Sequence, residues 1–172
     1  MLSIADRRAI AEQTITDRDF RDLMLNDPRR AVAEATGKSL PEADRIELVE
    51  EGDTAWSFVM IDPSAIDATL PEPHDARSAI ENEVYGLLRD QPGLADHAER
   101  DPVAFLRDRF GVDVNAVDFR REGKGETLLL LPNIDTREEL SDELLDLVAG
   151  GGDPGSQSAE WESQRTTEGH ET

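Results

Sequence analysis

Asp27-Pro28-Arg29-Arg30-Ala31-Val32-Ala33-Glu34-Ala35-Thr36-Gly37 has the pattern of one complete helix with its start and stop signals. We expect Asp27 to cap the helix, Pro28 to occupy its first position and Gly37 to end it. Asp101-Pro102 and Gly111 repeat this punctuation 74 positions later (101 minus 27, and 111 minus 37). The stretch therefore predicts an internal duplication, around whose two copies the rest of the chain is arranged.

The flanks of both copies follow the same order of elements. Ser3 is expected to cap a helix that runs through residues 10–11, and Thr16 to start a second helix. Downstream of each copy lie two β-rich runs separated by glycine-containing turns, a pattern that predicts a β-hairpin. The expected hairpins pair residues 46–49 with 55–61, and residues 117–120 with 126–131.

This order predicts an α+β fold in which a helix–helix–β-hairpin unit occurs twice. A proline-containing linker and a helix at about residues 79–88 are expected to join the units. We divide the chain into a first repeat with the N-terminal helices (1–80), a second repeat (81–151) and a disordered tail (152–172). The alternative is that Asp-Pro…Gly is ordinary helix punctuation that occurs twice by chance.

Composition excludes several classes of function. The net charge of −21 over 172 residues argues against nucleic acid or an anionic membrane as a partner, because both would repel the chain. The chain contains no cysteine, so it has no disulfide, thiolate metal site or cysteine nucleophile. We find no signal peptide and no segment for membrane insertion, and we expect the chain to be made in the cytoplasm.

The second repeat ends in a stretch with the chemistry of a protease cleavage site. Leu140-Ser141-Asp142-Glu143-Leu144-Leu145-Asp146-Leu147-Val148-Ala149-Gly150-Gly151 predicts an acidic amphipathic helix that stops at two glycines. A protease with a narrow cleft needs residues without side chains beside the scissile bond, and Gly150 and Gly151 provide them. The alternative is a C-terminal helix with an ordinary glycine stop.

These residues resemble the double-glycine leader ending of bacterial ribosomally made peptides. The resemblance implies cleavage after Gly151 by a peptidase-containing ABC exporter, with Leu140, Leu145 and Val148 as peptidase recognition residues. Leu144 departs from the family pattern, which usually has an acidic residue there. Gly152 leaves open which of the two adjacent glycine bonds is cut.

A second resemblance covers residues 15–62 and 85–151. The Asp27–Gly37 stretch, Ile46-Glu47-Leu48-Val49-Glu50 and Ser57-Phe58-Val59-Met60 are similar to the nitrile hydratase alpha subunit, and more so to nitrile-hydratase-type leader peptides (NHLP, the proteusin precursors). Nitrile hydratase holds its metal with a cysteine cluster after the first hairpin. Here that position reads Asp62-Pro63-Ser64-Ala65, so metal-dependent nitrile hydration is excluded and no metal or cofactor is expected.

The tail after Gly152 is nearly devoid of aliphatic residues, and we expect it to be disordered. On the leader-peptide resemblance it is the core peptide, the substrate of tailoring enzymes. Its hydroxyl groups and its one indole ring are the candidate modification positions. These are Ser156, Ser158, Trp161, Ser163, Thr166, Thr167 and Thr172.

No catalytic constellation is visible, and we expect a protein that is not an enzyme. His74, His97 and His170 lie in different segments, so we interpret them as solvated or loop histidines. The folded leader is expected to bind tailoring enzymes, with residues 46–49 or 126–131 as candidate edge strands. The alternative function is a metal-free scaffold or binding protein related to the nitrile hydratase alpha subunit.

Overall fold

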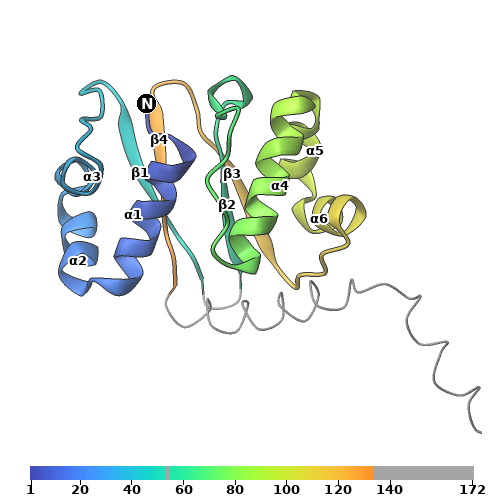
Figure 1. The fold of residues 1–172 in the computed structure, drawn as a ribbon, viewed down its shortest axis with the longest axis horizontal. Coiled ribbons are helices and arrows are strands. Elements are labelled where there is room, and N and C mark those ends of the chain that lie inside the picture. Colours follow the sequence, from blue (N-terminus) through green and yellow to red (C-terminus); the bar gives the residue numbers. More distant parts are fainter. Residues whose placement is uncertain (53–54, 134–172) are drawn as a thin grey trace, which may run out of the picture.

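The fold is known from a computed structural model, which describes residues 1–52 and 55–133 and shows a mixed α+β architecture (Figure 1). Within these residues, each half contributes three α-helices followed by two strands. The elements of the first half are α1 (Ile4–Thr16), α2 (Arg18–Asn26), α3 (Pro28–Thr36), β1 (Arg45–Glu50) and β2 (Trp56–Met60). Those of the second half are α4 (Ala76–Asp90), α5 (Ala95–Arg100), α6 (Pro102–Phe110), β3 (Val117–Arg121) and β4 (Glu126–Leu131). Two 3-10 turns, Pro63–Ala65 and Pro92–Leu94, flank α4.

The helix start and stop signals predicted from the sequence are confirmed. Asp27 and Asp101 cap α3 and α6, and each of these helices has proline in its first turn. Gly37 and Gly111 end them at φ 69° and 67°, a left-handed conformation that residues with a Cβ rarely adopt. The start of the second helix is off by one residue, because Asp17 caps α2 by accepting a hydrogen bond from the Phe20 amide (3.0 Å).

The predicted β-hairpins are wrong, although all four strands occur where the sequence placed them. In the described part of the chain, each strand pairs in parallel with a strand of the other half. The β1–β4 ladder runs from Arg45 opposite Glu126 to Glu50 opposite Leu131. The β2–β3 ladder runs from Trp56 opposite Val117 to Met60 opposite Arg121. Each of the two two-stranded sheets therefore contains one strand from each half, so the halves are interlocked.

Burial explains why consecutive strands do not pair with each other as hairpins. All five residues of β2 are buried, and so are four of the six in β4. Along β4, Leu128 faces the core formed with α4, α5 and α6, whereas Leu129 and Leu131 face the core formed with α1, α2 and α3. A strand that is covered on both faces carries a continuous apolar run, which is typical of parallel pairing.

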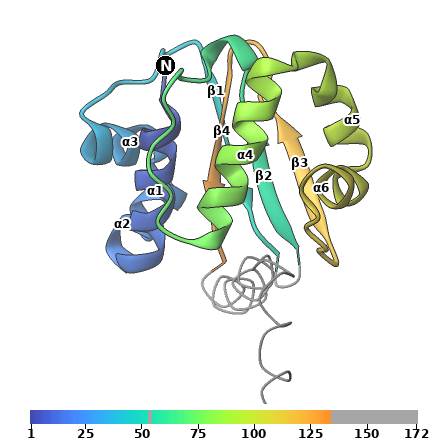
Figure 2. The same cartoon turned by 45° about the vertical axis from the view of Figure 1, so that its right-hand side comes forward.

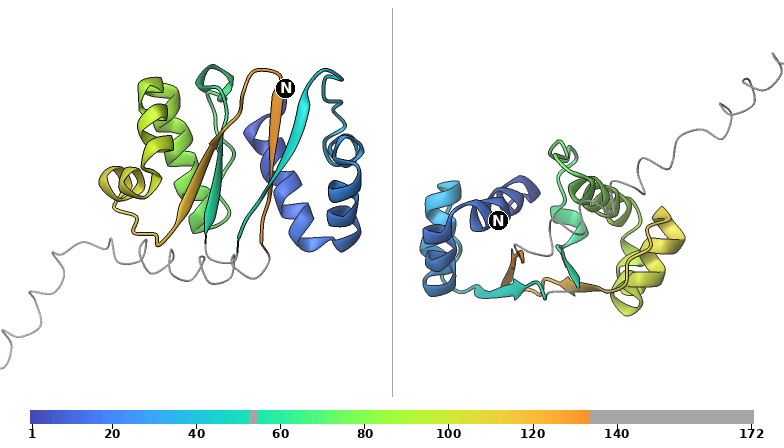
Figure 3. Two further views of the ribbon diagram at one scale, coloured as in Figure 1. Left: turned by 180° about the vertical axis from the view of Figure 1, so that it is seen from behind. Right: turned by 90° about the horizontal axis from the view of Figure 1, so that it is seen from below.

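The helices form two groups, one beside each pair of strands. Figure 2 shows β1 and β4 beside α1, α2 and α3, and β2 and β3 beside α4, α5 and α6. Seen from below, α1 and α4 lie on one side of the strands, whereas α2 and α3 lie next to β1 at one end and α5 and α6 next to β3 at the other (Figure 3). Among the described residues, no helix is long and apolar enough to cross a membrane.

Helix α4 confirms the helix predicted at about residues 79–88, but it is the counterpart of α1 and not only a connection between the units. Both helices begin the three-helix run of their half, and both carry a capping box at the N-terminus, Ser3 with Asp6 and Asp75 with Ser78. The boundary at residue 80 therefore falls inside α4. The helix predicted at residues 140–149 and the tail at 152–172 lie outside the described residues.

The capping box of α1 also binds the end of α3. The Asp6 carboxylate accepts hydrogen bonds from the Ser3 amide (2.7 Å) and the Lys38 ammonium (2.6 Å), and its side chain is 16% exposed. Burial alone would raise the pKa of Asp6, but the hydrogen bonds from Lys38 and Ser3 lower it below its ordinary value. The charged form of Asp6 therefore stabilises the contact between α1 and α3.

Because each strand pairs with a strand of the other half, we predict that neither half folds alone. We expect fragments 1–72 and 73–172, divided in the exposed loop before α4, to show no cooperative unfolding separately, since every strand of either fragment lacks its partner. Mixing the fragments is expected to restore cooperative unfolding and the amide spectrum of the intact chain. A cooperative thermal transition of either isolated fragment would contradict the structure.

The Asp6 contact predicts a pH-dependent stability difference. Because its folded-state pKa is lowered, Asp6 stabilises the fold above its unfolded-state pKa, and this contribution is lost as pH falls through the folded value. Urea unfolding of Asp6→Asn at pH 7 is expected to show a loss of about 1 kcal/mol. The loss should shrink between about pH 5 and pH 2. Asp22→Asn on the exposed surface of α2 is the matched control, with little loss at either pH.

Candidate functional site

The residues predicted to take part in processing lie outside the described residues. This holds for the cleavage residues Gly150 and Gly151, for the peptidase recognition residues Leu140, Leu145 and Val148, and for the modification candidates between Ser156 and Thr172. Their roles stay predictions. The described structure instead shows how the chain that leads to them leaves the fold.

The end of β4 and the two residues after it are held to the folded module by three hydrogen bonds. Arg21 of α2 donates to the Pro132 carbonyl (2.8 Å), and the Asn133 amide donates to the Glu51 carboxylate (3.3 Å). The Glu51 amide in turn donates to the Leu131 carbonyl (3.1 Å). We call Arg21, Glu51, Pro132 and Asn133 the exit anchor, because it fixes where the chain leaves the sheet.

Glu51 of the exit anchor belongs to a buried ion pair. Its side chain is 1% exposed, and that of Arg77, its partner on α4, is 8% exposed. Arg77 binds both carboxylate oxygens of Glu51 and also donates to the Ser57 carbonyl (3.0 Å). The Ser57 amide donates to Glu51 as well (3.1 Å), so the carboxylate joins the β1–β2 turn, β2 and α4.

The surroundings of Arg77 keep it charged. Burial alone would lower the pKa of Arg77, but the carboxylates of Glu81 and Glu51 raise it above its ordinary value. Glu81 lies one turn further along α4, at 3.1 Å from the Arg77 Nε. The guanidinium also lies over the Trp56 ring, 5.4 Å from its centroid, which adds a cation–π contact.

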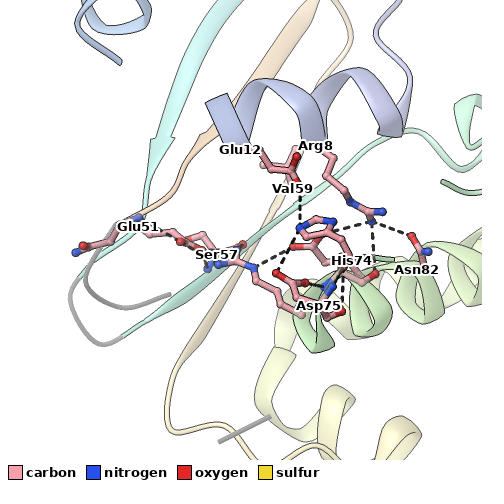
Figure 4. A network of polar contacts seen from close by, with 12 residues as sticks. Arg8, Glu12, Glu51, Ser57, Val59, His74, Asp75 and Asn82 are labelled. Carbon is pink, nitrogen blue, oxygen red and sulfur yellow. Dashed lines mark hydrogen bonds and ion pairs between the residues drawn. The ribbon is translucent and has the colours of Figure 1, made fainter. Parts of the chain in front are cut away.

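A second polar network lies between α1 and α4 (Figure 4). Arg8 donates to the Asn82 side-chain oxygen (2.9 Å), and these two residues are 74 positions apart. That separation equals the offset of the two helix copies, so equivalent positions of the repeats meet here. The contact marks an approximate twofold axis of the duplicated fold.

The described histidines do not form a metal or catalytic cluster. His74 lies in the loop before α4, as predicted, with its Nε2 at 2.7 Å from Glu12 and 3.4 Å from Asp75. His97 lies on the exposed surface of α5 with its ring edge-on against Phe105, so it is solvated, as predicted, although it stands in a helix. Within residues 1–52 and 55–133, no group of three or more His, Asp or Glu side chains could hold a metal ion.

Tyr85 is a buried core residue of α4. Burial raises the pKa of its hydroxyl well above the ordinary value. The protonated hydroxyl donates to the Val59 carbonyl (2.8 Å). Tyr85 therefore ties α4 to β2.

Comparisons with protein-family models, with curated proteins and with solved structures found no match. The described part of the chain offers a buried ion pair at the chain exit and an arginine-rich network on the approximate twofold axis.

Sequence reasoning missed Glu51, Arg77 and Arg8. Glu51 stands in a predicted turn and Arg77 in an unassigned loop, where charged residues are ordinarily solvated. Extending the 74-residue offset to the first helix makes Arg8 and Asn82 equivalent positions, but equivalence alone does not predict that the two side chains meet.

The buried ion pair predicts strongly unequal effects of single and double substitutions. Glu51→Gln or Arg77→Met leaves a buried charge without its partner, and we expect each to lower the free energy of unfolding by about 3–5 kcal/mol. The double variant should lose much less than the sum of the two.

Urea unfolding of the four proteins measures this coupling. The control is Arg107→Met, which breaks an exposed pair with Asp108 and should cost less than about 1 kcal/mol. Additive losses in the double variant would contradict the coupling.

Proposed function

We propose that the chain is the precursor of a ribosomally synthesised, post-translationally modified peptide. Residues 1–151 form the leader, which recruits tailoring enzymes, and residues 152–172 are the core peptide. Cleavage after Gly151 releases the core for export through a peptidase-containing ABC exporter, while the precursor itself is cytoplasmic. The chain has no catalytic role in this proposal.

The observation that carries the proposal is the position of the double-glycine motif relative to the folded module. The motif begins at Leu140, a few residues after Asn133, where the exit anchor binds the chain to Glu51. A substrate segment attached so close to a folded handle is held at high local concentration by any enzyme that binds the handle. The resemblance to nitrile-hydratase-type leader peptides supports the same assignment.

The charge of the leader supports a protein partner with a basic surface. Of the net charge of −21, residues 152–172 carry −4 (five Asp and Glu, one Arg), so the leader carries −17, which provides long-range attraction to basic grooves and repels nucleic acid. A tailoring enzyme that binds this leader is therefore expected to present Lys and Arg residues, and its association should weaken with salt.

Peptidase digestion tests the cleavage position. We expect the isolated peptidase domain of a double-glycine exporter to cut the full-length chain once, releasing a peptide whose mass corresponds to residues 152–172. Gly151→Val is expected to abolish cleavage, because the narrow cleft admits no branched side chain beside the scissile bond. Gly155→Val, the matched control in the tail, should be cut as the unmodified chain is.

An uncut chain would contradict the proposal. If the exporter peptidase leaves the full-length protein intact while cutting a known double-glycine leader, the scaffold alternative related to the nitrile hydratase alpha subunit takes precedence. A product that begins at Asp153 would instead keep the proposal and move the cut to the bond after Gly152.

A further inference from the structure

Each of the four strands pairs along one edge only in the part of the chain that the structure describes. The other edge of a strand carries backbone amides and carbonyls to which a further strand can bind. In β4 and β2, side chains occupy that second edge. Leu128 is bound at its amide by Glu122 (2.9 Å) and at its carbonyl by Arg7 (2.7 Å). The backbone of Ser57 is bound in the same way by the buried ion pair of the exit anchor.

The second edges of β1 and β3 differ in what lies beside them. Helices α5 and α6 pack along β3, and Arg121 at the end of β3 is paired with Asp96 (2.8 Å) and Glu99 (3.2 Å) of α5. Among the described helices, none packs along β1 to the same extent. Helices α2 and α3 lie next to β1 at one end (Figure 3), where Ile46 and Leu48 pack their side chains on the core of these helices.

The hydrogen bonds at the two ends of β1 show which of its residues face the second edge. The Arg45 amide donates to the Gly125 carbonyl (2.9 Å), and the Glu51 amide donates to the Leu131 carbonyl (3.1 Å). Alternate residues of a strand bond the same neighbour, so the odd-numbered residues of β1 bond β4. The backbone groups that point the other way form the open edge of β1, and they belong to Ile46, Leu48 and Glu50.

The surroundings of the open edge are acidic. Arg45 is bound to Glu47 (3.2 Å), so its charge is already compensated. Glu42, Asp44 and Glu50 have no ion pair within the described residues, and Glu42 and Glu50 are exposed. These carboxylates attract a strand that carries Lys or Arg. A second copy of the chain, with its own net charge of −21, is repelled.

We infer that the open edge of β1 binds an extended strand of alternating basic and apolar residues, presented by a partner protein. The strand adds to β1 through backbone hydrogen bonds. Its apolar side chains cover the partly exposed Ile46 and Leu48, and its basic side chains meet the unpaired carboxylates. Of the two edges expected from the sequence, residues 46–49 are selected, because β4 is bound on both sides. That this partner is a tailoring enzyme rests on the proposed function, whereas the binding itself does not.

Titration of the full-length chain with the hexapeptide acetyl-(Lys-Val)₃-amide tests the inference without any cleavage step. We expect saturable shifts in the amide NMR signals of Ile46, Leu48 and Glu50, together with slower hydrogen exchange at these amides. Binding should weaken as sodium chloride is added, because salt screens exposed charges. The matched peptide acetyl-(Glu-Val)₃-amide should bind about tenfold more weakly or worse, since like charges then meet.

Two substitutions at Glu50 separate backbone pairing from charge. Glu50→Pro removes an amide that bonds nothing in the β1–β4 ladder, and an edge strand tolerates proline at such a position. The loss of this donor leaves a partner carbonyl unpaired, so peptide binding should weaken about tenfold. Glu50→Gln removes only an exposed charge and should weaken binding about threefold. Equal binding by the two folded variants would show that the backbone of β1 is not used and would overturn the inference.

Hydrogen exchange of the free, unsubstituted chain gives a check that needs no variant. The Ile46, Leu48 and Glu50 amides should exchange faster than those of Glu47 and Val49, which bond β4. Slow exchange at all five amides would show that the edge is already covered. Dimerisation of the free chain that Glu50→Pro abolishes would show that a second copy occupies it. Either result, or equal affinity for the two hexapeptides, would overturn the inference.

Discussion

The fold depends on backbone pairing between the two halves of the chain. Strand β1 completes its ladder with β4, and β2 completes its ladder with β3, so every strand takes its partner from the other repeat. Such pairing requires long loops to close before any ladder forms, which makes the halves one cooperative unit. The two hydrophobic cores meet at β4, whose successive leucines face opposite sides. The strands thus link the packing of one helix group to that of the other.

The buried polar groups lie where these interlocked segments meet. Glu51 and Arg77 join the β1–β2 turn, α4 and the chain exit, and Arg8 joins the paired helices α1 and α4. A buried ion pair adds little net stability compared with apolar side chains of equal volume. Here the ion pair fixes positions: the Glu51 carboxylate accepts hydrogen bonds from Arg77, from the Ser57 amide and from the Asn133 amide, and so holds α4, β2 and the chain exit together. The exit of the chain is therefore fixed relative to both helix groups.

Local signals in the sequence predicted the elements well and their partners badly. Asp27, Gly37 and their copies act within one helix, so their chemistry is visible without tertiary structure. The hairpin prediction failed because a short turn between β1 and β2 reverses the chain whether or not the strands pair. The run Leu128-Leu129-Leu130-Leu131 carried the missing signal, since continuous burial is typical of a parallel strand and not of a half-exposed hairpin. Glu51, Arg77 and Arg8 could not be found from spacing alone, because their partners come from other elements.

The Arg8–Asn82 contact distinguishes a duplicated single chain from a dimer of single repeats. A single repeat would obtain its strand partners from a second molecule, as an intertwined homodimer. In that symmetric assembly the position on the axis would face its own copy, and two arginines there would repel each other at close range. Within one chain the two equivalent positions can hold different residues, so the Arg8 guanidinium can face the Asn82 amide. Fusion of the repeats thus permits an asymmetric centre that no pair of identical molecules could carry.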